Sequence, residues 1–174
     1  MTTRQIIILG FMGTGKTTVA LELSRKLNCR AVDLDDLITQ RSARGPREII
    51  EQDGEAAFRV IETQMLREVL REESPRVVAV GGGAWTIAEN RKLIAEQGAF
   101  TVWLDAPFEL CWKRIAGNEA RPLAPSREAA QILFAKRRPI YELADARIPV
   151  SENETADELA TKVARTVMPQ NANI

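Results

Sequence analysis

Short apolar runs alternate with segments of helical periodicity along the chain. Ile6–Leu9 is apolar throughout, as expected for a strand that is buried on both faces of a sheet. A weaker run at residues 147–150 contains Pro149, which indicates an edge strand or the end of a strand. The other runs that resemble the first one are residues 31–32, 77–80 and 101–104. The pattern predicts about five strands.

Amphipathic helices are predicted between these runs. In residues 17–27 the apolar positions fall on one face of a helix, and in residues 58–70 they recur at the spacing of an amphipathic helix. Two further helices are expected to begin at capping boxes, in which a Thr and a Glu three residues later bond each other's backbone N–H groups. These boxes are Thr86 with Glu89, and Thr155 with Glu158.

Strands that alternate with helices form crossover units, which build a parallel sheet with helices on both faces. We therefore expect an α/β protein with three layers, αβα, around a central parallel sheet of about five strands. Residues 1–174 are expected to form one domain, with a frayed tail over residues 169–174. Because such sheets bind ligands at the carboxyl ends of their strands, functional residues should follow the apolar runs.

The composition excludes several kinds of chemistry. The 174 residues include 24 Lys+Arg, 24 Asp+Glu and no His. Without His the chain cannot hold a Ser-His-Asp triad, a Cys-His pair or a His-ligated metal, so a general base has to be another group such as a carboxylate. A net charge of zero argues against a general nucleic-acid binder and favours a monomer.

The cysteines and the apolar segments bear on the compartment. Cys29 and Cys111 are too few for a disulfide framework and are expected to be free thiols. No apolar segment is long enough to span a bilayer or to act as a secretion signal, so we expect no membrane partner and a cytoplasmic location.

A phosphate-binding loop follows the first predicted strand. Residues 10–17, Gly-Phe-Met-Gly-Thr-Gly-Lys-Thr, fit the Walker A pattern G-x-x-x-x-G-K-[ST]. Glycines let the backbone N–H groups converge on phosphate oxygens, and the helix that follows adds the positive end of its dipole. Lys16 is expected to reach the β- and γ-phosphates, and the Thr17 hydroxyl to bind Mg²⁺. The predicted nucleotide-binding residues of this loop are Gly13, Thr14, Gly15, Lys16, Thr17 and Thr18.

Carboxylates and glycines follow the next two strands. The second strand ends in Asp33, Asp35 and Asp36, of which one could cap the next helix and another could accept a proton from a substrate hydroxyl or hold water on Mg²⁺. Three glycines, residues 81–83, follow the third strand and let the backbone approach a ligand closely. No Walker B-type acid ends this strand, which points away from switch GTPases and motor ATPases.

Three arginines are candidates for anion binding. Arg59 lies near the start of the helix over residues 58–70, and Arg137 lies near the end of a later helix. Arg121 belongs to a Gly- and Pro-interrupted stretch, residues 117–126, that we interpret as a mobile loop. The planar fork of Arg suits carboxylates and phosphates.

In this order the motifs resemble those of the shikimate kinase family, small P-loop enzymes of chorismate and aromatic amino-acid biosynthesis. The resemblance covers residues 6–168. It rests on the Walker A loop, the D-x-D pair at 33–35, F-R-x-x-E at 58–62, the glycine triplet, R-P-L at 121–123 and R-x-P-x-Y at 137–141. It implies a fold like that of the P-loop nucleoside monophosphate kinases with a mobile lid, and it implies ATP, shikimate and Mg²⁺ as ligands.

The resemblance also implies roles in binding the acceptor. Asp35 would hold the substrate hydroxyl and act as its base or orienter. Arg59 and Arg137 would bind the shikimate carboxylate, and Gly81 and Gly82 would offer backbone N–H groups.

Further roles implied by the resemblance concern the nucleotide. Asp33 would bind Mg²⁺ through water, with Thr17 as a direct ligand. Arg121 would swing in on the lid toward the ATP phosphates and act in catalysis beside Lys16, and Arg114 would pack on the adenine. Two alternatives to a shikimate kinase remain open: a P-loop kinase of another small hydroxy acid of the gluconate type, and a non-catalytic ligand-sensing domain.

Overall fold

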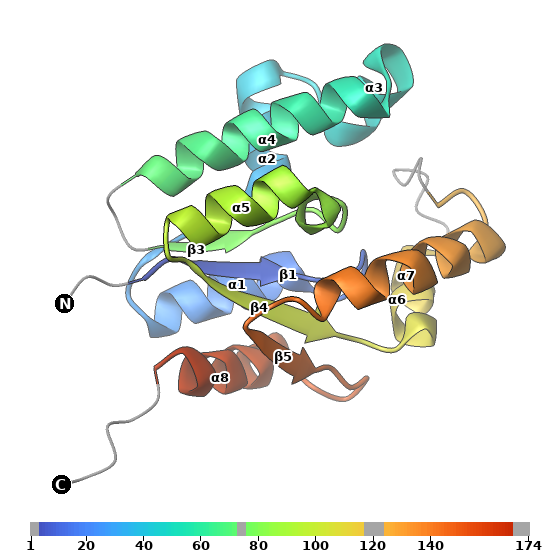
Figure 1. Cartoon of the computed structure of the whole chain (residues 1–174). Coiled ribbons are helices and arrows are strands. Elements are labelled where there is room, and N and C mark those ends of the chain that lie inside the picture. Colours follow the sequence, from blue (N-terminus) through green and yellow to red (C-terminus); the bar gives the residue numbers. More distant parts are fainter. Residues whose placement is uncertain (1–3, 73–75, 117–123, 169–174) are drawn as a thin grey trace, which may run out of the picture.

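A computed structural model describes residues 4–72, 76–116 and 124–168. Within these residues, five strands form one parallel sheet in the order β2-β3-β1-β4-β5 (Figure 1). The strands are β1 (Ile6–Leu9), β2 (Arg30–Asp33), β3 (Arg76–Ala79), β4 (Phe100–Asp105) and β5 (Ala146–Pro149). The predicted α/β class with a central parallel sheet is thereby confirmed.

Helices cover both faces of the sheet. Figure 1 shows α1 and α8 on one face and α4 and α5 on the other, which is the expected αβα layering. The helices of the described chain are α1 (Lys16–Lys26), α2 (Leu34–Ser42), α3 (Pro46–Asp53), α4 (Glu55–Arg71), α5 (Ala88–Glu96), α6 (Phe108–Ile115), α7 (Arg127–Tyr141) and α8 (Ala156–Val167), with a 3₁₀ helix, η1, at Ala84–Thr86.

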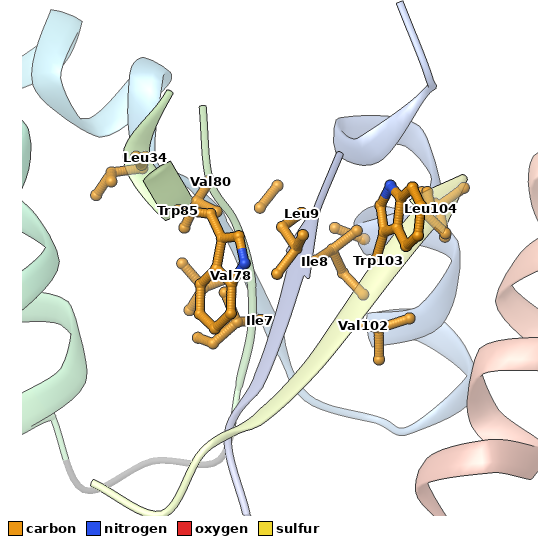
Figure 2. Close-up of a cluster of buried hydrophobic side chains, with 14 of the residues drawn as sticks. Ile7, Ile8, Leu9, Leu34, Val78, Val80, Trp85, Val102, Trp103 and Leu104 are labelled. Carbon is orange, nitrogen blue, oxygen red and sulfur yellow. The ribbon is translucent and has the colours of Figure 1, made fainter. Parts of the chain in front are cut away.

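The core is built around β1. This strand lies between β3 and β4, and its side chains Ile7, Ile8 and Leu9 have no exposed surface. Figure 2 shows them between Val78 on one side and Val102 on the other. Burial of each such side chain contributes about 1.5–3 kcal/mol, so a continuous apolar run is what this central position requires.

The two edge strands differ from this pattern. The residues of β2 are only half-buried or exposed because no strand covers its outer side. The expectation that residues 31–32 are buried on both faces is therefore wrong. β5 lies at the opposite edge and ends at Pro149, as the proline indicates.

The two predicted capping boxes have different outcomes. Thr155 caps α8 and forms the full box with Glu158. Thr86 instead belongs to η1, where its hydroxyl donates to the carbonyl of Gly83 at 2.6 Å, and Ile87 occupies the N-cap of α5. The prediction of a box at Thr86 is wrong because this hydroxyl bonds within the preceding turn.

The ends of β1 and β3 lie side by side at the carboxyl edge of the sheet. Because α1 and α5, which follow these strands, lie on opposite faces, the two connections diverge there, and sheets of this kind bind ligands at such a point (Figure 1). Both cysteines are free thiols, as expected. In the described part of the chain, the helices are too short or too polar to cross a membrane.

Candidate active site

The loop between β1 and α1 folds tightly against its neighbours. Gly10 and Gly13 have positive φ angles of 148° and 82°. A Cβ at Gly10 would lie 2.7 Å from the carbonyl oxygen of Leu104, and one at Gly13 would lie 2.7 Å from that of Cys111. Only glycine satisfies both the backbone conformation and the space at these two positions.

The first turn of α1, next to the loop, is not capped by a side chain. Gly15 is its N-cap and supplies no side-chain hydrogen bond, so the first N–H groups of the helix are available to phosphate oxygens. The ammonium group of Lys16 donates to the carbonyl of Phe11 at 3.0 Å, which holds it across the loop. This geometry suits the binding of a polyphosphate.

Thr17 and Asp33 meet beside the loop. The Thr17 hydroxyl donates to Oδ2 of Asp33 at 2.5 Å. Oδ1 of Asp33 accepts the backbone N–H of Asp35 at 2.9 Å and caps α2, so one of the three Asp residues is a helix cap, as the sequence indicated. The same carboxylate therefore begins α2 and faces the phosphate loop.

These two side chains fit a magnesium ion. Both offer oxygen ligands, the donor type that Mg²⁺ prefers. Among the described residues no cluster of three or more His, Cys, Asp or Glu could form a complete metal cage. Mg²⁺ commonly keeps several waters and binds one or two protein groups together with substrate phosphates, and Thr17 with Asp33 matches that pattern.

A second group of side chains lies close to the glycine triplet after β3, residues 81–83, which we call the floor of the site. A Cβ at Gly81 would lie 3.0 Å from Oε1 of Glu62 and 3.3 Å from Oδ1 of Asp35. A Cβ at Gly82 would lie 3.2 Å from Nη1 of Arg137. The structure thus brings Asp35, Arg137 and the glycines together from α2, α7 and the loop after β3.

Arg59 reaches the same floor from α4. A Cβ at Gly83 would lie 2.6 Å from the guanidinium carbon of Arg59, so a side chain at this glycine would displace the arginine. Arg59 also forms ion pairs with Glu55 at 3.0 Å and with Glu62 at 2.7 Å, and its side chain is 17% exposed. Arg59 is therefore paired but still partly accessible to solvent.

Glu62 is a buried acid in this group. Its side chain has no exposed surface, and within the described residues its Oε1 has no hydrogen-bond partner. Burial raises the pKa of Glu62 to about 7, against the opposing charges of Arg59 and Arg137, and the nearby Asp35 carboxylate raises the pKa further. The sequence singled out Glu62 in the F-R-x-x-E segment but assigned it no role.

Tyr141 anchors the glycine triplet at Gly82, the glycine next to Arg137. Its hydroxyl donates to the carbonyl of Gly82 at 2.6 Å, and burial raises the pKa of Tyr141 to about 12. The phenol therefore remains protonated as a donor. Arg137, which is 6% exposed, lies beside the same glycine, and its positive charge opposes the rise in the pKa of Tyr141. Tyr141 thus holds the loop after β3, and Arg137 from the same helix lies next to it.

Arg114 lies on the other side of the phosphate loop. Its Nη1 donates to the carbonyl of Gly13 at 3.1 Å. With the loop, Glu154 and Leu159 it lines a cavity of about 430 Å³. Arg121 and most of residues 117–126 lie outside the described residues, and so does the tail over residues 169–174.

Comparisons with known proteins agree on one family. A family model described as shikimate kinase matches residues 12–168. A shikimate kinase from Geobacter sulfurreducens is 40% identical over 94% of this chain and 91% of its own length, and one from Cereibacter sphaeroides is 37% identical over 92% and 80%. A structure of shikimate kinase from Acinetobacter baumannii in complex with shikimate has 31% identity and a TM-score of 0.91, and the match covers 99% of this chain and 97% of that one.

Proposed function

This chain belongs to the shikimate kinase family, and on that premise we propose that it transfers the γ-phosphate of ATP to the 3-hydroxyl of shikimate. The products are shikimate 3-phosphate and ADP, in the biosynthesis of chorismate and the aromatic amino acids. One observation carries the proposal: two arginines and two carboxylates converge on the glycine triplet beside the phosphate loop.

The donor site is the phosphate loop. The N–H groups of the loop and of the first turn of α1 bind the phosphates of ATP, and Lys16 leaves the carbonyl of Phe11 to pair with the β- and γ-phosphates. Arg114 is assigned to the adenine on the family resemblance, and its place in the lining of the cavity beside the phosphate loop supports this role. Arg121 is assigned to the same phosphates on the family resemblance alone.

Thr17 and Asp33 would hold the magnesium ion, Thr17 through its hydroxyl and Asp33 through water. The ion supplies positive charge that stabilises the phosphates during transfer. In the structure the Thr17 hydroxyl donates a hydrogen bond to Asp33, which leaves a lone pair of the hydroxyl oxygen available to a cation.

The acceptor site is the floor of glycines. A small acid with several hydroxyls needs a cation for its carboxylate and acceptors for its hydroxyls. Arg59 and Arg137 supply the positive charge for the carboxylate, since they approach Gly83 and Gly82 respectively. Backbone N–H groups of the triplet supply further hydrogen bonds to the acceptor.

Asp35 serves the reacting hydroxyl. It projects from the first turn of α2, over Gly81 and close to the Asp33 that faces the phosphate loop. In this chain without His, a carboxylate at the border between donor and acceptor sites is suited to accept the hydroxyl proton or to orient the hydroxyl for in-line attack. Positioning of this kind supplies much of the catalysis in phosphoryl transfer.

The proposal is tested by a coupled ADP-release assay with ATP, Mg²⁺ and, in turn, shikimate, quinate and gluconate. Shikimate is expected to stimulate ADP release strongly, and the other two acids are expected to stimulate it weakly or not at all. ADP release that stays at the ATPase background with shikimate would overturn the proposal. A response to gluconate alone would identify a kinase of another hydroxy acid.

A further inference from the structure

The last turn of α7 presents side chains in two directions. Arg137 and Tyr141 face the glycine triplet, whereas Arg138 faces the end of β4. Pro139 lies within this turn, and proline has no N–H to donate to the carbonyl four residues earlier. The turn that carries Arg137 is therefore held less by its own backbone than a regular turn would be.

Asp105, the last residue of β4, binds this turn from the sheet. Nη1 and Nη2 of Arg138 donate to Oδ1 and Oδ2 of Asp105 at 2.7 and 3.2 Å, which is a two-point fork. The Asp105 side chain is only 7% exposed, so little water competes for it. Arg147 on β5 donates to Oδ2 of the same carboxylate through its Nε at 2.8 Å.

Trp103, two residues earlier on β4, supports the same contact. The guanidinium groups of Arg138 and Arg147 lie 5.1 and 5.2 Å from the centroid of its ring. The ring of Tyr141 lies 6.1 Å from the ring of Trp103, centroid to centroid. The strand thus contacts the turn both at Arg138 and at the tyrosine that bonds Gly82.

We propose that Asp105 is a positioning residue: its ion pair with Arg138 holds the last turn of α7 on the sheet and so keeps Arg137 directed at the acceptor site. The inference rests on the proposed function, in which Arg137 binds the acceptor carboxylate. It adds a role for two residues that do not touch the acceptor themselves. Removal of the pair should weaken acceptor binding without affecting the phosphate loop.

The test compares Arg138→Ala with the matched control Arg147→Ala. Each variant removes one guanidinium from both Asp105 and Trp103, but only Arg138 lies on α7. Arg138→Ala is expected to raise the KM for shikimate about tenfold, or about 1.4 kcal/mol, with the KM for ATP and kcat close to wild type. Arg147→Ala is expected to leave the shikimate KM unchanged.

Two further variants sharpen the comparison. Asp105→Asn is expected to reproduce the rise in shikimate KM, and the Asp105→Asn/Arg138→Ala double variant to raise it no further, since both changes break one contact. Arg138→Lys should recover part of the loss. An unchanged shikimate KM in Arg138→Ala would overturn the inference, even if the melting temperature falls. Equal effects of Arg138→Ala and Arg147→Ala would also overturn it.

Arg137→Ala, measured in parallel, separates this inference from the proposed function. If Arg137→Ala raises the shikimate KM and Arg138→Ala does not, only the positioning role is wrong. If Arg137→Ala leaves the shikimate KM unchanged, the carboxylate site itself is wrongly placed, and the inference is overturned with it.

Discussion

Arg59 and Glu62 form an ion pair whose acid is completely buried, with Nη1 of Arg59 2.7 Å from Oε2 of Glu62. The pair holds the arginine over Gly83 on the floor of the acceptor site. The second carboxylate oxygen of Glu62, Oε1, lies close to Gly81, so the pair spans the triplet, with Glu62 at Gly81 and Arg59 at Gly83. The arginine that we propose to bind the acceptor carboxylate is thus also one partner of a buried ion pair.

The buried acid should make stability depend on pH. Its carboxyl has an ordinary pKa of 4.5 when exposed and a pKa of about 7 in the fold. The folded protein therefore binds this proton more tightly than the unfolded chain does. The unfolding free energy that protonation of Glu62 contributes is fully present below pH 4.5 and is lost as the pH rises through 7. The expected loss is about 2 kcal/mol of unfolding free energy between about pH 5.5 and about pH 8.

Denaturant unfolding of wild type and Glu62→Gln at both pH values measures this loss. The variant should lack the decrease, whereas Glu68→Gln, at a half-exposed position on the same helix, should keep it. An equal decrease in wild type and Glu62→Gln would show that Glu62 is not its source.

Gly83→Ala should impair the acceptor site alone. The backbone of Gly83, with φ −91°, suits any residue, and the three described atoms nearest to a new Cβ all belong to the Arg59 guanidinium. We expect the displaced arginine to raise the shikimate KM about tenfold or more, with the KM for ATP unchanged. Gly45→Ala, whose Cβ would meet nothing closer than 3.9 Å, is the control. Steady-state kinetics with a shikimate KM at the wild-type value in Gly83→Ala would contradict the placement of Arg59.

Arg59→Ala and Arg137→Ala should mainly raise the KM for shikimate. A hydrogen bond to a charged group contributes about 1.5–3 kcal/mol, which corresponds to about a 10- to 150-fold rise for each variant. Arg67→Ala, on the same helix as Arg59 but paired with Glu89, is the control.

Arg59→Ala has a second effect, because it leaves Glu62 buried without its partner. Breaking a buried pair in this way costs about 3–5 kcal/mol. The Arg59→Ala/Glu62→Gln double variant should therefore recover the melting temperature but not the shikimate KM. Recovery of both would mean that Arg59 acts only by stabilising the fold.

Asp33→Asn should change the magnesium dependence while leaving α2 in place. Asn is as good a helix cap as Asp, so the bond to the N–H of Asp35 can persist, but the negative charge is lost. The Mg²⁺ concentration for half-maximal rate should rise about tenfold, because one of the two protein groups at the ion loses its charge. The rate is measured against Mg²⁺ at saturating ATP and shikimate, with circular dichroism as the control for folding. An unchanged magnesium dependence would place the ion elsewhere.

The fold was largely predictable because its signals are local. Ile6–Leu9 is apolar along its whole length, and this matches its central place in the sheet. Local signals were insufficient where a side chain has two possible partners. Thr86 and Thr155 have the same spacing to a glutamate, yet Thr86 bonds the carbonyl of Gly83, and Glu89 pairs with Arg67.

The residues of the site were predictable from sequence motifs, but the contacts between them were not. The sequence indicated Asp35, Arg59 and Arg137 individually, and the structure brings them to one floor of glycines. The burial of Glu62 depends on the packing of α4 against the loop after β3, which spacing does not reveal. Asp105 and Arg138 are 33 residues apart, and only the folded sheet shows that they are partners.

The central claim is that Asp35 presents the 3-hydroxyl of shikimate to ATP. The most direct measurement is phosphorus NMR of the product formed from ATP, Mg²⁺ and shikimate by wild type and by Asp35→Asn. Wild type should form shikimate 3-phosphate in a one-to-one ratio with ADP, and Asp35→Asn should form it at least about 100-fold more slowly with little change in the KM for ATP. Wild-type enzyme that phosphorylates a different hydroxyl or none, or an Asp35→Asn variant that forms the product at the wild-type rate, would contradict the claim.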